Sequence, residues 1–217
     1  MRLKFSPAGL LFAAFTVGLL PGTARAQEHA EMLQGLGSRF LVFREKVQDE
    51  IGLSAEQKSH VNARAFDFVQ ETMEFFQSLQ NAKPDDRPKK HGEYAQKANE
   101  KIEALLKKSL KDEQLKRLKE IGLQAEGLFA IGHPEVSKEL KITDEQRTQF
   151  MEVMQSFQKQ VEPLAKEMEK QGGDHKEFAK KVQKLRDEHQ IEIRAFLTDD
   201  QKTHWKEMQG KPFKLED

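Results

Sequence analysis

Imidazole and carboxylate side chains are the groups in this sequence that could hold a metal ion. The 217 residues include seven histidines and no cysteine, so a transition-metal site would need nitrogen and oxygen ligands, a set that zinc accepts. No two histidines have the i, i+3 or i, i+4 spacing that places two ligands on one face of a helix. Asp174, His175 and Glu177 form one loose cluster at a turn and are metal candidates. The alternative for each histidine is a position on the solvated surface.

A second metal candidate depends on a repeated phrase. LSAEQKSHV from Leu53 and LTDDQKTHW from Leu197 are two copies of it, and His60 and His204 each follow the leading leucine by seven residues. Helices that pack together could bring these two histidines into one zinc-type site. The sequence has no Gly-rich phosphate loop, Gly-x-Ser-x-Gly motif, cysteine nucleophile or His-Glu-x-x-His motif. We therefore predict no catalytic residue, no cofactor and no enzymatic activity.

The phrase occurs twice more, as LKDEQLKRL from Leu110 and ITDEQRTQF from Ile142. In three copies a hydroxyl residue is followed three positions later by glutamine, which is the pattern of a capping box at the start of a helix. The predicted helix-capping residues are Ser54, Gln57, Gln114, Thr143, Gln146, Thr198 and Gln201. Because Lys111 stands where the other copies have a hydroxyl, we expect that helix to begin a residue or two away, capped by Ser109 or Asp112.

Apolar residues recur behind the phrases with the four-three spacing of an amphipathic helix. They are Val61, Ala65, Phe68, Thr72, Phe75 and Leu79 after the first copy, and Phe150, Met154, Phe157, Val161, Leu164 and Met168 after the third, at a constant offset of 89. All but Thr72 are apolar, and each stripe predicts a seam that packs against a neighbouring helix. Weaker stripes follow at an offset of 87, where His189 matches Ile102. We expect His189 at the edge of its stripe, with a ring nitrogen toward water.

Turn residues divide this helical pattern. Two prolines in NAKPDDRPKKHGE (81–93) and two glycines in KQGGDHK (170–176) mark the turns of two hairpins. Pro163 lies inside the third helix pattern and should kink it. We predict an all-α fold of long amphipathic helical hairpins, with a helix over about 30–50 and then two tandem units. The units would cover residues 27–126 and 127–217 and would have arisen by duplication.

Residues 1–26 have the layout of a cleavable signal peptide. A basic start precedes an uncharged apolar run from Leu10 to Leu20, and Ala24-Arg25-Ala26 supplies the small residues of a cleavage site. The run is shorter than the roughly 20 residues needed to span a bilayer. We therefore expect cleavage after Ala26, export to the periplasm or an equivalent compartment, and no membrane span afterwards. The remaining chain has 33 basic and 36 acidic residues, a formal charge of −3, which does not predict nucleic-acid binding.

An exported, cysteine-free helical chain with four such phrases resembles the LTxxQ-motif (Spy/CpxP-like) family of periplasmic proteins. The copy from Leu197 to Gln201 matches the motif in full, the other three vary it, and the resemblance covers about Val47 to Met208. Family members are small helical proteins with two motifs that dimerise into a curved cradle. The resemblance implies that this chain forms a cradle-like pseudo-dimer by itself, and its oligomeric state is open between such a monomer and a homodimer.

The resemblance also implies a function, namely that of an ATP-independent chaperone or envelope-stress adaptor that binds unfolded or partner proteins in the cell envelope. The alternative is a metal-responsive periplasmic sensor or scavenger of the zinc type, since some relatives bind transition metals. A surface for clients could combine cations with leucines. The cations are Lys107, Lys108, Lys111, Lys116, Arg117 and Lys119, and the leucines are Leu106, Leu115 and Leu118. Such a surface would attract acidic clients, and the alternative is an ordinary solvated face.

Overall fold

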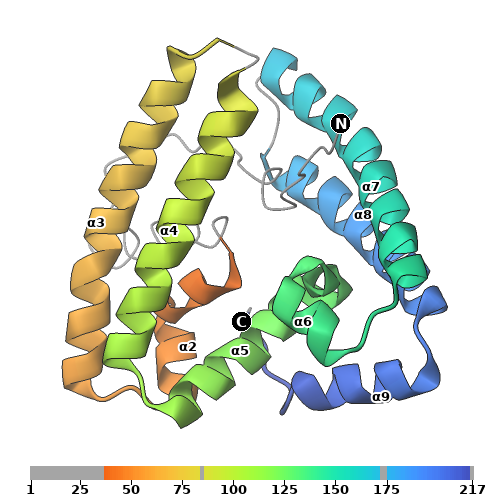
Figure 1. Ribbon diagram of the computed structural model, residues 1–217. Coiled ribbons are helices and arrows are strands. Elements are labelled where there is room, and N and C mark those ends of the chain that lie inside the picture. Colours follow the sequence, from red (N-terminus) through yellow and green to blue (C-terminus); the bar gives the residue numbers. More distant parts are fainter. Residues whose placement is uncertain (1–36, 84–85, 172–174, 216–217) are drawn as a thin grey trace. The chain divides into compact units, whose positions relative to one another are not determined.

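The computed structural model describes residues 37–83, 86–171 and 175–215, and these residues form helices and turns without a strand (Figure 1). The predicted all-α class is confirmed. The predicted leader, residues 1–26, lies outside the described residues. No helix in the described part of the chain combines the length and apolarity that crossing a bilayer requires. The described residues divide into two compact units, one up to Ala125 together with Gly210 to Leu215, and the other from Glu126 to Gln209.

Unit 1 is built around the pair of long helices α3 and α4, which lie side by side (Figure 1). Its elements are η1 (Ser38–Phe43), α2 (Glu45–Glu50), α3 (Ala55–Gln80), α4 (Arg87–Ser109) and α5 (Asp112–Glu126). The single helix predicted over about 30–50 is wrong in the described residues. Arg44, with extended backbone angles, separates η1 from α2.

The core of unit 1 joins η1 to the α3–α4 pair. The ring of Phe40 meets that of Phe68 edge to face at 5.2 Å between centroids. Thr72, the one polar residue of the predicted seam, is fully buried and donates to the carbonyl of Phe68 at 2.7 Å. Its hydroxyl is also 2.6 Å from the Tyr94 hydroxyl, and the Tyr94 ring stacks on Phe75. The polar residue is therefore accommodated because the facing helix α4 supplies a hydroxyl partner.

Unit 2 contains the second pair of long helices, α7 and α8, which also lie side by side (Figure 1). Its elements are η3 (Gly127–Gly132), α6 (Pro134–Glu139), α7 (Asp144–Gln171), α8 (His175–Phe196) and α9 (Asp199–Met208). Phe157, Val161 and Val182 form a buried cluster between the long helices. Helix α7 continues through Pro163, and the kink predicted there stays a prediction.

Both units end their short α-helix in the same hydrogen-bonded turn. In unit 1 Leu53 N donates to Gln48 O, and in unit 2 Ile142 N donates to Ser137 O, each at 2.9 Å. These are the bonds of a Schellman motif, which needs a left-handed residue just past the helix. Gly52 has φ 67° there, and Lys141 has φ 53°. Unit 2 therefore holds a lysine in a conformation that favours glycine.

The last described residues return to unit 1. Phe213 and Leu215 pack against its core, although the sequence-based division placed all of 127–217 in the second unit. Two separated glycines, Gly127 and Gly210, have positive φ, one near each place where the chain passes from one unit to the other.

Candidate functional site

The glutamines of the first two phrases bond to each other in unit 1. Gln57 Nε2 donates to Gln114 Oε1 at 2.8 Å, and Gln114 Nε2 donates to Gln57 Oε1 at 3.2 Å. The second hydrogen of each amide reaches a backbone carbonyl, that of Ser109 for Gln57 at 2.8 Å and that of Gly52 for Gln114 at 2.9 Å. Each carbonyl belongs to the segment that enters the partner's helix. The pair therefore links two helix starts that are 57 residues apart.

Unit 2 repeats the arrangement with the third and fourth phrases. Gln146 Nε2 donates to Gln201 Oε1 at 2.7 Å, and Gln201 Nε2 donates back at 2.9 Å. The remaining amide hydrogens reach the carbonyls of Phe196 and Leu140 at 2.9 and 3.1 Å. We call each such reciprocal pair, Gln57 with Gln114 and Gln146 with Gln201, a glutamine clasp.

The clasp glutamines also cap their helices, as predicted. Capping boxes are formed by Ser54 with Gln57, Thr143 with Gln146, and Thr198 with Gln201. The expected displacement of the second phrase is wrong, because α5 begins at Asp112, in the same register as the others. Lys111 N donates to Gln114 Oε1 at 2.9 Å. The glutamine half of the box is thus enough to keep the helix start in place.

The metal candidates do not form a cluster in the described residues. No group of three or more His, Asp or Glu side chains there could hold an ion. His60 is exposed in unit 1, whereas His204 belongs to unit 2 and lies 3.3 Å from Glu207. Glu177 forms an ion pair with Lys181. Asp174 and the side chain of His175 lie outside the described residues. Zinc binding stays a prediction, which calorimetric titration of chelator-treated protein would test.

His189 is a core residue, not the edge residue that the sequence suggested. Its side chain is 2% exposed, and its ring meets Phe157 edge to face at 5.5 Å. Nδ1 is 2.8 Å from the Leu185 carbonyl and therefore carries the proton, while Nε2 accepts from Gln160 at 3.3 Å. A protein amide takes the place expected for water, because Gln160 on α7 reaches over the seam.

A cationic group that the sequence reading missed lies beside η3. Arg186 on α8 donates to the Glu126 carbonyl at 3.0 Å, and its guanidinium lies 5.3 Å from the centre of the Phe129 ring. Burial lowers the pKa of Arg186, and the nearby Glu126 and Asp187 oppose that shift. His133 contacts the Glu126 carboxylate at 2.6 Å. These contacts hold η3 against the long helices of unit 2, so the role of Arg186 is structural.

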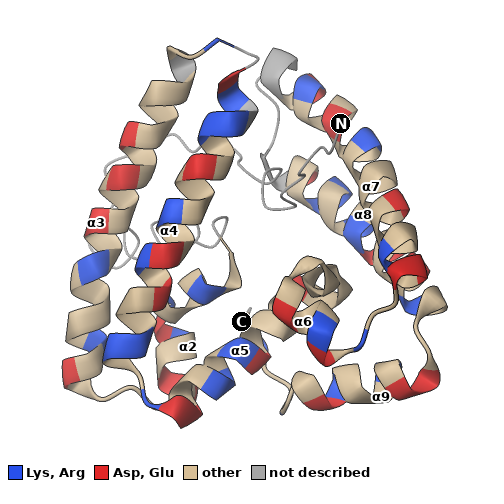
Figure 2. Ribbon diagram, viewed as in Figure 1, with Lys and Arg blue, Asp and Glu red and all other residues tan. Residues whose placement is uncertain are grey.

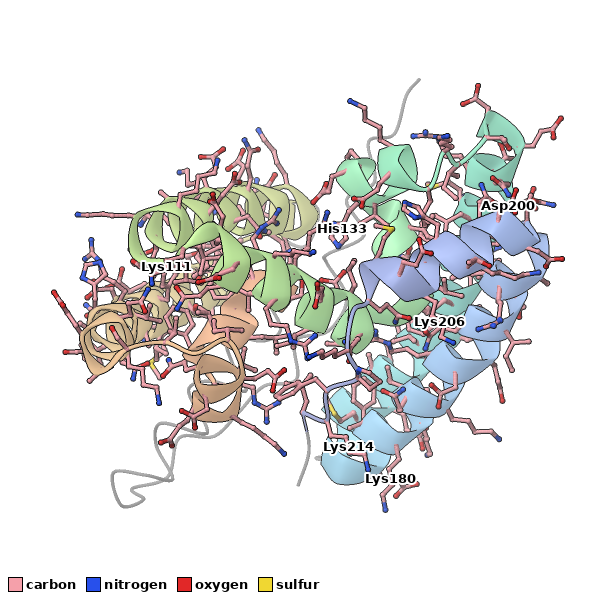
Figure 3. All side chains as sticks on the ribbon, turned by 90° about the horizontal axis from the view of Figure 1, so that it is seen from below. Lys111, His133, Lys180, Asp200, Lys206 and Lys214 are labelled. Carbon is pink, nitrogen blue, oxygen red and sulfur yellow. The ribbon has the colours of Figure 1, made fainter. Side chains whose placement is uncertain are left out.

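Two of the three leucines beside the lysine-rich surface are buried. Leu106 and Leu118 are buried in the core of unit 1, and Leu115 packs against it. Figure 3 shows the labelled Lys111, which is exposed. Lys and Arg alternate with Asp and Glu along the long helices (Figure 2). Leu106 and Leu118 are therefore not available to a client, and client binding at this surface stays a prediction.

An open groove on unit 2 is the best candidate for contact with another polypeptide. It is lined by Gln149, Glu152, Val153 and Ser156 from α7 and by Glu192, Ala195 and Phe196 from α8. Ile191, one helical turn before Ala195, is 70% exposed. Glu152 and Glu192 form no ion pair with a described residue. The groove thus combines apolar contact area with two carboxylates that are open to a cation.

Unit 1 has charged residues at three of the positions that line this groove in unit 2. At the same offsets of 89 and 87, Val153 corresponds to Arg64, Ser156 to Asp67 and Ala195 to Lys108. Arg64 and Asp67 form an ion pair at 2.8 Å. Phe66, on the same helix, is an exposed aromatic residue. A comparison of the two stripes at these outward positions, not only at the seam, would have indicated the groove from the sequence.

Fold and surface together give an all-α chain with a candidate polypeptide-contact groove and, in its described residues, no group of three or more side chains that could hold a metal ion. Comparison of the chain with models of known families, with curated proteins and with solved structures found no match.

Proposed function

We propose that this chain is an exported protein that binds other polypeptides without ATP, as a periplasmic chaperone or envelope-stress adaptor. The observation that carries the proposal is the α7–α8 groove with Ile191 beside it. A large apolar side chain gains about 1.5–3 kcal/mol when it is removed from water completely. A partner that covers Ile191, Val153 and Phe196 would collect part of that free energy. The resemblance to the LTxxQ-motif proteins supports the same class of function.

The charges of the groove favour one kind of client segment. Because Glu152 and Glu192 form no ion pair with the residues that the structure describes, an apolar segment flanked by Lys or Arg fits better than an acidic one. This differs from the acidic clients that the lysine-rich surface suggested. Charge would mainly accelerate encounter and set preference, and apolar contact would supply the affinity.

We also propose that the two units derive from one duplicated ancestor and form a pseudo-dimer in a monomeric chain. The equal order of elements and the two clasps support the duplication. Light scattering after size exclusion tests the oligomeric state. An obligate dimer whose isolated halves do not fold would contradict the pseudo-dimer.

The binding function is tested by suppression of aggregation of a heat-unfolded client without nucleotide. We expect suppression by the unchanged protein and a clear loss with Ile191→Lys, which places a charge beside the groove. Ala104→Lys is the matched control, because Ala104 is the exposed residue at the equivalent position on α4. No suppression at several-fold molar excess of the unchanged protein, or an equal loss with both variants, would refute the proposal.

A further inference from the structure

The C-terminal segment from Gly210 to Leu215 has the features of a bound extended peptide. It contains no helix, and its first three residues are exposed, whereas Phe213 and Leu215 are partly buried on either side of the exposed Lys214. Pro212 restricts the residue before it to extended backbone angles. Successive side chains of an extended chain point to opposite sides. The segment thus presents two apolar side chains, two positions apart, to the core of unit 1.

Two side chains of α5 form hydrogen bonds with the backbone of this segment. Gln124 Nε2 donates to the Lys211 carbonyl at 2.7 Å, and Gln124 Oε1 accepts from Phe213 N at 2.8 Å. Arg117 Nη1 donates to the same Lys211 carbonyl at 2.9 Å. One amide thus satisfies the carbonyl and the N–H of an extended chain two residues apart. Such contacts recognise a backbone and not a particular side chain.

Arg117 is held in position for this contact. Its guanidinium bonds Glu50 at 2.6 Å and Glu120 at 2.8 Å. Burial lowers the pKa of Arg117. The hydrogen bonds and charges of Glu120 and Glu50 raise this pKa by more than burial lowers it, so the net shift is upward. The donor is therefore a fixed cation.

The site belongs to unit 1 alone and uses the extra length of α5. Helix α5 has 15 residues, whereas α9, its counterpart, has 10 and ends at Met208. Gln124 lies in the additional turns. Gly210 begins the segment with φ 61°, and a Cβ there would lie 2.1 Å from Glu120 Oε2. The left-handed backbone favours glycine at this point, and a side chain there would displace the Glu120 carboxylate.

We propose that Gln124, Arg117 and the adjoining core of unit 1 form a second polypeptide-binding site, which the chain's own C-terminal segment occupies in cis. Its ligand class is an extended segment with apolar residues at positions i and i+2. The inference deepens the proposed binding function and rests on it. Release of the tail would expose the site to clients of the same pattern.

Tethering determines how strongly the tail competes. A segment joined by a short chain has an effective concentration on the order of millimolar. If the isolated peptide binds with a Kd of roughly 10 μM, the tail would weaken binding of an added peptide about 100-fold. The unchanged protein should therefore bind little added peptide.

The test uses the full chain and a fluorescent peptide with the sequence GKPFKLED. Phe213→Ser with Leu215→Ser releases the tail by removing its apolar contacts, and Gly210→Ala releases it through the backbone. We expect both variants to bind the peptide at least tenfold more tightly than the unchanged protein, measured by anisotropy. Adding Gln124→Ala to the double variant should remove this gain, whereas Gln96→Ala, an exposed glutamine on α4, should not. A peptide with serine in place of phenylalanine and leucine should not bind.

Several outcomes would overturn the proposal. Released variants that keep their helical circular dichroism but bind no more peptide would do so. Loss of helical structure in both variants would show that the tail is part of the core and not a ligand. The client-aggregation assay separates the two proposals, because peptide binding without any suppression refutes the chaperone function and leaves the site. Suppression that is unchanged by release, with no peptide binding, refutes the site and leaves the function.

Discussion

Breaking the clasp of unit 2 should lower the free energy of unfolding by more than the loss of a helix cap does. The effects of replacing Gln146 and Gln201 should also be non-additive. Gln201→Ala removes the acceptor of Thr198 N, the donor to Leu140 O and both bonds to Gln146. Loss of a cap costs about 1 kcal/mol. A buried polar group left without a partner costs about 1–3 kcal/mol more, and Gln146 is almost fully buried. We expect about 2–4 kcal/mol for either single change.

The double variant should be less destabilised than the sum of the singles. Once Gln146 is absent, removing Gln201 no longer leaves an amide without its partner. Residues in one hydrogen-bonded network commonly show coupling of 0.5–3 kcal/mol, and two reciprocal bonds place this pair at about 1–2 kcal/mol. The coupling free energy is the quantity that distinguishes a clasp from two independent caps.

Trp205 makes the measurement specific to unit 2. It is the one tryptophan of the sequence, it is buried on α9, and it follows Gln201 by one turn. Urea unfolding followed by its fluorescence would give the stabilities of the four proteins. Gln183→Ala is the matched control, because Gln183 is exposed on α8 and bonds only Asp187 among the described residues, and it should change stability by less than about 0.5 kcal/mol. Additive single effects, or single effects no larger than that of the control, would refute the reasoning.

Three further predictions concern the clasp of unit 2, the contact between Thr72 and Tyr94, and the two left-handed residues that end the short helices. Gln201→Glu keeps the capping acceptor but loses both donors, so we expect a cost of about 2–4 kcal/mol at neutral pH that shrinks in acid, where a protonated carboxyl donates again; a cost below about 0.5 kcal/mol would mean that the glutamine only caps. Burial raises the pKa of Tyr94, the Thr72 hydrogen bond lowers it and the charge of Glu71 raises it, and the net shift is upward. The free energy of unfolding should therefore be constant below the unfolded tyrosine pKa of about 10. It should fall as the pH rises from there through the pKa of the folded state. Thr72→Val should raise the Tyr94 pKa further, which ultraviolet titration of this single tyrosine would detect, with Thr148→Val on α7 as the control. Lys141→Gly should stabilise unit 2 by about 1 kcal/mol by relieving its left-handed backbone. Gly52→Ala should destabilise unit 1 by a similar amount through backbone strain alone, because the added Cβ meets nothing within 4 Å. Destabilisation by Lys141→Gly, or stabilisation by Gly52→Ala, in urea unfolding would contradict this.

Local and periodic features of this fold were predictable from the sequence. A cap depends on residues three positions apart, so Ser54 with Gln57 was readable. The four-three spacing located Val61 and Phe157 in buried seams. The leading residues of all four phrases are buried, as expected from their apolar character.

Features that depend on distant partners were not predictable in the same way. Nothing local in the sequence shows that Gln57 meets Gln114, because 57 residues separate them. The return of Phe213 to unit 1 has no periodic signal, since an extended segment of six residues carries too few positions to show one. His189 was misplaced because its partner Gln160 comes from another helix. In each case the contacting residue lies on an element distant in the sequence, and the local sequence pattern does not show that the two elements are neighbours.

The presence of glutamine at the fifth position of the phrase follows from pairing more than from capping. A capping box accepts glutamate as well as glutamine, but a carboxylate cannot donate to the carbonyl of Gly52 or Leu140, and two facing carboxylates would repel. The second copy separates the two roles, because Lys111 provides no capping side chain and yet Gln114 is present and almost fully buried in the clasp. Four glutamines therefore join the helix starts within each unit, and we expect the contact surfaces where the two units differ. The proposed sites, the groove on unit 2 and the tail site on the longer α5, lie at such places.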